Sequence, residues 1–416
     1  MKEKLKSFLH LLSFRTIWDD EDDWEDYDLR EQYVSGAGEG NRSGQSVWGN
    51  GLVYLVILLL AVAAVAAYQF SSHRHTYTSY EVTDRYKAKD ITGTMYQKLG
   101  NHFVKYGSDG VTLVDGRGKT QWSSAYTIET PMTSTCGQTM MIYEEQGYQV
   151  IVLDKEGVIG NFKTDLPIMK GKVAKNGVSA LMLKDDSGAR IRLCSTDGTA
   201  LAEIKTTLEE KGYPLALDLT DDAKKLVLSL VRVGSGTIDS TIAFYDFSST
   251  AESAKEHKTG SFDYKDEVFP EVFFASDSTS AAIGDSGFVI FSDSSEAKVK
   301  KEVQLGTEVV SAFHDDSCLG FVLPGTLSDK RYMLRVYRYN GSVLSETPFG
   351  EGYSQIKMDS GEILLNNSGH VMAFTPKGVL RLNSDTKSRV DAFVKIPGFR
   401  KYAILSNSGI RRIKAE

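Results

Sequence analysis

The chain has 416 residues, of which 41% are hydrophobic, and a formal net charge of -7 at pH 7. This length allows two or three ordinary domains or one large repetitive domain. Residues 1–48 hold 6 Lys and Arg against 11 Asp and Glu, so the remainder, with 42 against 44, is close to neutral. A nearly neutral domain lacks the concentrated basic surface that phosphate recognition needs, which excludes nucleic acid as its main partner.

Residues 1–48 form an acidic tail that contains aromatic residues. Within residues 18–28, eight Asp and Glu are interrupted by Trp18, Trp24 and Tyr27. The carboxylates repel one another, so we expect the tail to be largely disordered when it is free. Because aromatic side chains are effective docking groups, two interpretations stay open: a motif that binds a cytoplasmic protein, and a solvated tail without a partner.

An uninterrupted apolar run follows at residues 51–68, and no charged residue occurs in residues 43–73. A helix of about 20 apolar residues covers the roughly 30 Å hydrocarbon core of a membrane. We therefore expect one transmembrane helix over residues 49–70. It is an uncleaved signal anchor, because the run begins too deep in the chain for a signal peptide. The residues assigned to this transmembrane helix include Gly51, Leu52, Tyr54, Leu60 and Tyr68.

From residue 77 onward, short β-branched and aromatic runs alternate with Gly, Asp, Asn and Ser, which is typical of an all-β fold. Pairs of runs recur eight times, and the second run of each pair ends near residues 115, 154, 195, 246, 292, 340, 375 and 414. A period of about 40 residues is expected of a four-stranded propeller blade. The sequence therefore predicts a β-propeller over residues 77–416, with eight blades, or seven if the weak unit at residues 268–292 merges with a neighbour.

The eighth unit is one strand short at its C-terminal end. Residues 76–83 have a strong strand sequence, and we expect them to supply the missing strand from the start of the domain. This closure would remove exposed strand edges, which otherwise promote aggregation. Residues 71–76 then form a short tether of less than about 20 Å, which holds the propeller near the membrane surface.

One turn in the first unit carries the residues Asp115, Gly118 and Trp122. Their spacing resembles the tryptophan-docking motif of quinoprotein-type (PQQ-like) eight-bladed propellers, and the resemblance extends over residues 77–416. The Asp and Gly make a tight turn, and the Trp covers the adjoining blade. The whole layout also resembles an uncharacterised family of single-pass, membrane-anchored propellers of Gram-positive anaerobes, a domain of unknown function. This resemblance implies a cytoplasmic tail and an extracytoplasmic propeller at the cell membrane, since Lys and Arg near the span do not decide its orientation.

The sequence contains no recognisable catalytic, cofactor-binding or metal-binding constellation. Its three cysteines are isolated, and the acidic clusters at residues 314–316 and 221–222 are interpreted as polar turns. We therefore expect a non-enzymatic scaffold or sensor without a cofactor, which binds an envelope protein or a glycan on the propeller. The alternative is a quinoprotein-like or carbohydrate-active enzyme with its site in the propeller channel.

Overall fold

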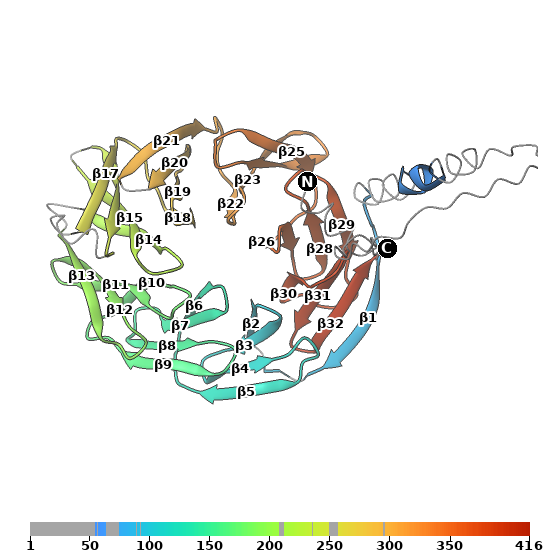
Figure 1. Ribbon diagram of the computed structural model, residues 1–416, viewed down its shortest axis with the longest axis horizontal. Coiled ribbons are helices and arrows are strands. Elements are labelled where there is room, and N and C mark those ends of the chain that lie inside the picture. Colours follow the sequence, from blue (N-terminus) through green and yellow to red (C-terminus); the bar gives the residue numbers. More distant parts are fainter. Residues whose placement is uncertain are drawn as a thin grey trace, which may run out of the picture. The chain divides into compact units, whose positions relative to one another are not determined.

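The fold is an eight-bladed β-propeller (Figure 1). The computed structural model describes residue 55 and residues 57–63, 75–88, 90–91, 93–207, 212–234, 236–248, 257–293 and 296–416. The strands in these ranges form eight four-stranded sheets. Neighbouring strands within each sheet are antiparallel. This confirms the all-β propeller and the eight repeats that the sequence predicts.

The first four blades follow the chain in simple order, with each strand paired to the next. Their strands are β2 (Met95–Leu99), β3 (His102–Tyr106), β4 (Gly110–Val114) and β5 (Thr120–Ala125) in blade 1; β6 (Pro131–Cys136), β7 (Thr139–Glu144), β8 (Gln149–Leu153) and β9 (Val158–Lys163) in blade 2; β10 (Ile168–Val173), β11 (Ser179–Asp185), β12 (Gly188–Cys194) and β13 (Ala200–Thr207) in blade 3; β14 (Tyr213–Leu219), β15 (Lys225–Val233), β16 (Ile238–Asp246) and β17 (Lys258–Tyr264) in blade 4.

The last four blades continue this order, except that blade 8 takes its outer strand from the N-terminal side of the propeller. Their strands are β18 (Glu271–Ser276), β19 (Thr279–Ile283), β20 (Gly287–Asp293) and β21 (Ala297–Gln304) in blade 5; β22 (Ser311–His314), β23 (Leu319–Leu327), β24 (Lys330–Tyr337) and β25 (Val343–Phe349) in blade 6; β26 (Gln355–Asp359), β27 (Glu362–Asn366), β28 (His370–Phe374) and β29 (Leu380–Asp385) in blade 7; β30 (Ala392–Lys395), β31 (Lys401–Ser406), β32 (Gly409–Ala415) and β1 (Tyr80–Lys87) in blade 8.

The hydrophobic core lies between the blades. In the described part of the chain, each pair of adjacent blades shares one cluster of buried apolar side chains, which gives eight clusters around the ring. The two middle strands of a blade are therefore buried on both faces, as in β7, where the first five residues are all buried. Strands of this kind are read from sequence as continuous apolar runs.

Strand β1 closes the ring by pairing with β32, from Tyr80 opposite Ala415 to Lys87 opposite Gly409. This confirms the predicted closure, although the strand begins at Tyr80 instead of residue 76. The reason is that Tyr77 pairs with blade 7 instead of blade 8, through a parallel bridge with Leu382 of β29. Its ring is buried, and the Arg400 guanidinium lies 4.6 Å from the ring centroid.

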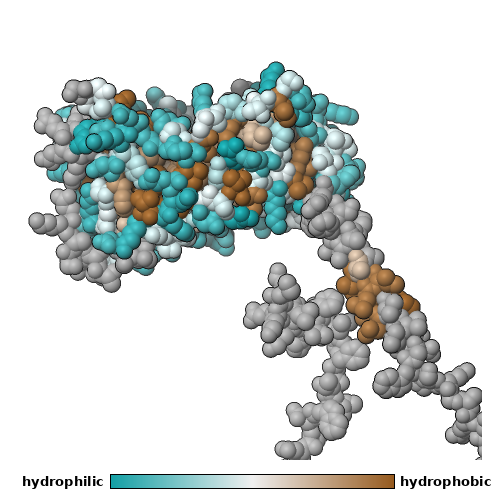
Figure 2. Space-filling model, turned by 90° about the horizontal axis from the view of Figure 1, so that it is seen from above, coloured by the Kyte–Doolittle hydropathy of each residue, from teal (hydrophilic) through white to brown (hydrophobic). Residues whose placement is uncertain are grey.

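Residues 1–65 and 66–416 form two separate units. In the first unit, residues 57–63 are helical and all of them are exposed. Of the helices in the described ranges, none combines the length and the apolar character that crossing a membrane requires. Most of the span predicted at residues 49–70 lies outside the described residues, and so does the whole tail with Trp18, Trp24 and Tyr27. Figure 2 shows brown, hydrophobic surface on the described helix and mixed, mainly hydrophilic surface on the propeller.

Candidate functional site

The candidate site is the mouth of the central channel, on the face that carries the turns between the first and second strands of each blade. The first strands of the blades lie toward the centre of the ring (Figure 1). Two cavities of about 440 and 550 Å³ are lined mainly by these strands and the turns that follow them. One cavity is contributed by blades 2 to 6 and the other by blades 7, 8 and 1. We call them the acidic half and the basic half.

The acidic half carries many more carboxylates than cations. The carboxylates of Asp277 and Asp316 make no hydrogen bond or ion pair with the described residues, so they stay available to a ligand. Fixed negative charges that converge on one cavity favour a cationic group there. The charged lining residues are Asp218, Asp221, Asp277, Asp315, Asp316 and Lys172.

Asp218 ties three blades together within the acidic half. Its Oδ1 lies 3.2 Å from the Lys172 Nζ of blade 3, and its Oδ2 accepts a 2.8 Å hydrogen bond from the Phe274 backbone N–H of blade 5. The negative charge of Asp218 raises the pKa of Lys172, although burial opposes this effect. Lys172 is therefore a charged structural partner of Asp218.

His314 is held in place by two neighbours in blade 5. Its Nε2 lies 3.1 Å from Glu271 Oε1, and its ring stacks on Phe273 with the centroids 3.5 Å apart. Burial acts to raise the pKa of Glu271, but the hydrogen bond and charge of His314 outweigh burial and lower it. The pair thus links blades 5 and 6 with Glu271 as a carboxylate.

Cys136 faces Asp221 at the edge of the acidic half. The thiol Sγ donates to Asp221 Oδ1 at 2.9 Å, and the Nζ of Lys175 lies 2.5 Å from Asp221 Oδ2. Burial, together with the hydrogen bond to Asp221, raises the pKa of Cys136 to about 12. The group is a protonated thiol near neutral pH, which is the unreactive form of cysteine.

The basic half is lined by three lysines and one aspartate from the inner strands of blades 1, 7 and 8. The Lys98 Nζ lies 2.5 Å from Asp359 Oδ1, and the Lys395 backbone N–H donates to Asp359 Oδ2 at 2.9 Å. The side chain of Lys357 makes no ion pair or hydrogen bond with the described residues, and burial lowers its pKa. An adjoining cavity of about 340 Å³ adds Arg117 and Arg412. Cations therefore outnumber carboxylates on this side of the mouth.

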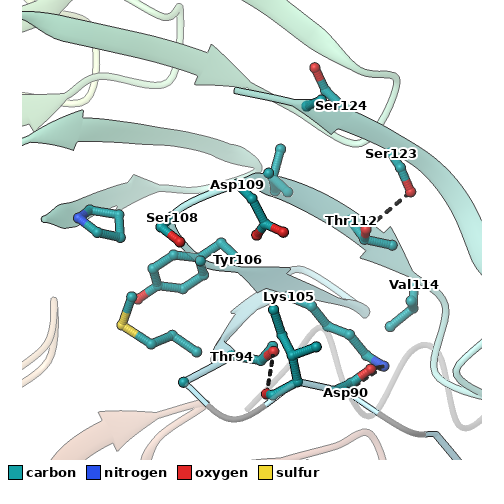
Figure 3. A pocket seen from close by; sticks show the side chains of 18 of the residues that line it. Asp90, Thr94, Lys105, Tyr106, Ser108, Asp109, Thr112, Val114, Ser123 and Ser124 are labelled. Carbon is teal, nitrogen blue, oxygen red and sulfur yellow. Dashed lines mark hydrogen bonds and ion pairs between the residues drawn. The ribbon is translucent and has the colours of Figure 1, made fainter. Parts of the chain in front are cut away.

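A larger recess of about 710 Å³ lies over blade 1, away from the channel mouth. Figure 3 shows its hydroxyl groups, with Thr112 and Ser123 joined by a 3.0 Å hydrogen bond. Lys105 and Asp90 neutralise one another at 2.8 Å. The recess is thus a polar surface without an excess of cations.

The predicted docking motif occupies the turn after β4 and the strand β5 that follows it, and its Asp115 also lines the cavity of about 340 Å³. Asp115 Oδ1 accepts hydrogen bonds from the backbone N–H groups of Arg117 and Lys119, and Gly118 has a φ of 78°. Trp122 contacts the next blade. The arrangement is structural, because it fixes one blade against another.

A family model covers residues 73–415, which is nearly the whole propeller. It describes the family of unknown function DUF5711. The chain belongs to this family. No curated protein shows significant similarity to the sequence.

The chain is also similar to solved structures of distant sequence. Sqt1 of Chaetomium thermophilum, bound to the N-terminus of the ribosomal protein L10, is 10% identical with a TM-score of 0.52, over 81% of this chain and 100% of that chain. BamB from Moraxella catarrhalis is 13% identical with a TM-score of 0.45, over 82% and 99%. A hydrazine synthase from Kuenenia stuttgartiensis is 12% identical with a TM-score of 0.43, over 80% and 97%.

The division of the channel mouth of this DUF5711 propeller into an acidic half and a basic half was not predicted from the sequence. Residues 221–222 and 315–316 lie in turns, as the sequence predicts, whereas His314 is the last residue of strand β22. Asp221, His314, Asp315 and Asp316 also line the acidic half. The described ranges contain no group of three His, Cys, Asp or Glu placed to hold a metal ion. Lys98 and Asp359 stand in inner strands of mixed polarity, MYQKL and QIKMD, so no local sequence pattern marks them as part of a site.

Proposed function

We propose that the chain is a membrane-anchored, non-enzymatic scaffold whose propeller binds an extracytoplasmic protein at the channel mouth. The observation that supports this function best is the division of the mouth into an acidic half and a basic half. Opposite charges at fixed positions on a rigid ring attract a partner and set its orientation, since charge complementarity governs encounter rate and register.

A protein is the class of partner that suits this surface. The two halves draw their residues from all eight blades, so a ligand that contacts both must extend across the mouth. A folded domain or a peptide can do this, whereas a small molecule occupies one cavity. Sqt1, which shares the fold, is bound to a protein terminus.

The apolar run supports attachment to a membrane. Residues 51–68 are continuously apolar, and side chains such as Leu58 and Leu60 are 63% and 64% exposed on the described helix. An apolar helix with all its sides exposed is unfavourable in water and suits a lipid environment. In this proposal residues 1–48 lie in the cytoplasm, where the acidic, aromatic segment recruits a second protein.

The recess over blade 1 favours a glycan as a second candidate ligand. Asp109, Thr94 and Ser124 offer hydroxyl and carboxylate groups to one space, and Tyr106 adds an aromatic ring (Figure 3). Sugar hydroxyls are recognised by such polar groups together with a ring face. A neutral oligosaccharide that protects the recess from chemical footprinting would support this candidate.

Site-specific crosslinking in intact membranes tests the main proposal. A photoreactive amino acid at Ser276 samples the acidic half, one at Ser360 samples the basic half, and one at Val343 on the outer strand β25 serves as the control. We expect the same protein to be captured from both halves and not from Val343. Replacing Asp277 and Asp316 with Asn should reduce capture at Ser276. Equal capture at Val343, or none at either half, would contradict a channel-mouth scaffold.

Two further measurements test the remaining parts of the proposal. The full-length chain should stay in the membrane pellet after an alkaline carbonate wash, and a chain lacking residues 51–68 should be released. The purified protein should carry no quinone absorbance and should not reduce dyes in a calcium-dependent way. A positive result in the dye assay would favour the quinoprotein-like enzyme.

A further inference from the structure

The basic half continues outward as one groove. Its two cavities, of about 550 and 340 Å³, share the lining residues Lys98, Asn101 and Pro397, so they are neighbouring parts of one surface depression. The first cavity lies over the inner strands of blades 7, 8 and 1, and the second reaches the turn after β4. We call this surface the basic groove. Its cations are Lys98, Lys357, Lys395, Arg117 and Arg412.

Two of these cations already have partners within the protein. Lys98 pairs with Asp359 at 2.5 Å and also donates to Ser360 Oγ at 2.8 Å. The Lys395 Nζ donates to three backbone carbonyls, the shortest bond being 2.7 Å to Gly398. These two lysines are structural, because their charges are satisfied without a ligand.

The other three cations lack such partners. The side chains of Lys357, Arg117 and Arg412 make no hydrogen bond or ion pair with any described residue. Lys357 is partly buried, and its desolvation lowers its pKa even though Asp359 is nearby. A partly buried cation without a partner is costly to the folded protein, and an anionic ligand offsets that cost.

We propose that the basic groove binds an acidic peptide segment, whose carboxylates pair with Lys357 at the channel end and with Arg117 and Arg412 at the outer end. This inference rests on the proposed function, because it states the chemistry of the partner segment that lies on the basic half. The apolar Pro397 lines both cavities and Met358 lines the inner one, so the segment carries apolar or aromatic side chains between its carboxylates.

The distribution of charge favours a peptide over a single phosphate. A phosphate site needs donors that converge on one point, usually with backbone N–H groups among them. Here the cations without partners belong to both cavities: Lys357 lines the inner one, and Arg117 and Arg412 line the outer one. The guanidinium groups of Arg117 and Arg412 can pair with a carboxylate in a bidentate way, and the ammonium group of Lys357 can pair with a second carboxylate at the other end.

A binding titration with a defined peptide tests this inference. The full-length chain in lipid nanodiscs is titrated with a labelled peptide of the sequence WDDEDDWEDYD, which corresponds to residues 18–28 and combines carboxylates with aromatic side chains. The same peptide with Asn and Gln in place of Asp and Glu is the ligand control. We expect saturable binding of the acidic peptide that weakens as salt is raised, and at least about tenfold weaker binding of the amide peptide.

Variants of the protein assign the binding to the groove. Lys357→Met, and separately the double change Arg117→Gln with Arg412→Gln, should each weaken peptide binding about tenfold, since each removes a charge-assisted contact. Lys119→Gln removes a cation from the same turn without touching the groove and should change binding less than about twofold. Lys357→Met should not lower the melting temperature, because an unpartnered cation is removed, so weaker binding by this variant cannot be attributed to unfolding.

The possible outcomes separate this inference from the proposed function. Equal binding of the two peptides, or unchanged binding by both groove variants, overturns the acidic-peptide assignment. Neither result contradicts the proposed function, which is tested separately by crosslinking at Ser276 in the acidic half. Saturable displacement of the peptide by millimolar inorganic phosphate at constant ionic strength also overturns it, in favour of a phosphate site. Tight binding that is lost only in the groove variants supports it.

Discussion

The indole Nε1 of Trp122 donates a hydrogen bond to the backbone carbonyl of Lys155, 3.1 Å away in the next blade. Lys155 follows Asp154 in the turn between β8 and β9. An equivalent contact joins blades 6 and 7, where Ser345 Oγ donates to the carbonyl of Pro376 at 2.8 Å. Trp122 and Ser345 both lie four residues after a turn glycine. The position four residues after the turn glycine therefore makes the same kind of contact with the next blade in two blades of this chain, although the side chains differ.

The first prediction concerns the hydrogen bond of this contact. Trp122→Phe keeps an aromatic ring but removes the donor, so it should lower the free energy of unfolding by about 1 kcal/mol. Ser345→Ala should cost a similar amount for the same reason. Urea unfolding followed by far-UV circular dichroism measures both. Gln121→Ala, at an exposed neighbouring position, is the control and should have little effect. A Trp122→Phe protein as stable as the parent would show that the contact is only steric.

The sequence predicted the ring of blades because the two middle strands of each blade are buried on both faces. Runs such as those at β7 and β8 are almost wholly apolar, and their repetition sets the period. Outer strands such as β5 alternate between exposed and partly buried residues, so they are hard to recognise singly. This is why eight pairs of strands were found and the start of β1 was misplaced.

The channel mouth could not be predicted in the same way. Lys98 and Asp359 form one ion pair but lie 261 residues apart in the sequence, in inner strands of mixed polarity. Their meeting depends on the closure of the ring, which brings blade 1 beside blades 7 and 8. A local pattern cannot reveal contacts that topology alone creates.

The second prediction concerns ring closure. A chain that lacks residues 1–92 loses β1, so the edge of β32 is left unpaired. We expect its melting temperature to fall and its aggregation to increase with concentration, because unpaired edges recruit other strands. A chain that lacks only residues 1–74 keeps Tyr77 and β1, and it is the matched control. Differential scanning calorimetry and light scattering compare the two. Equal melting temperatures would mean that blade 8 is stable with three strands.

The third prediction concerns stability at alkaline pH. Burial raises the pKa of Cys194 and of Cys318 to about 11, and that of Cys136 to about 12. In the unfolded chain these thiols ionise near their ordinary pKa of 9.0, so the unfolded state binds fewer protons above that pH. Their contribution to stability is therefore complete below about pH 9 and is lost as the pH rises toward 12. Urea midpoints measured from pH 8 to 11 should stay level up to about pH 9 and decrease above it. A flat profile would contradict the raised values.

The fourth prediction isolates one cause of the raised pKa of Cys136. Asp221→Asn removes the carboxylate that accepts the thiol hydrogen bond, so the pKa should fall and alkylation should accelerate. Each unit of decrease gives about tenfold more thiolate at pH 8. Asp222→Asn is the matched control, because Asp222 contacts Thr220 and Lys224 instead. Mass spectrometry of the Cys136 peptide after timed iodoacetamide treatment measures the rate. Equal rates in the two variants would show that burial alone controls this thiol.

The last prediction tests how closely two blades approach at a glycine. Gly160 of β9 lies against the backbone of Thr196 in the turn after β12, so an added Cβ would collide with the Thr196 carbonyl. The turn cannot move without disturbing the hydrogen bonds of Ser195 and Thr199 that form it. Gly160→Ala should therefore lower the free energy of unfolding by about 1 to 3 kcal/mol, the usual cost of overpacking. Gly352→Ala is the control, because a Cβ there meets nothing within 4 Å. Equal urea midpoints for the two variants would mean that blades 2 and 3 can separate freely, which their shared buried cluster argues against.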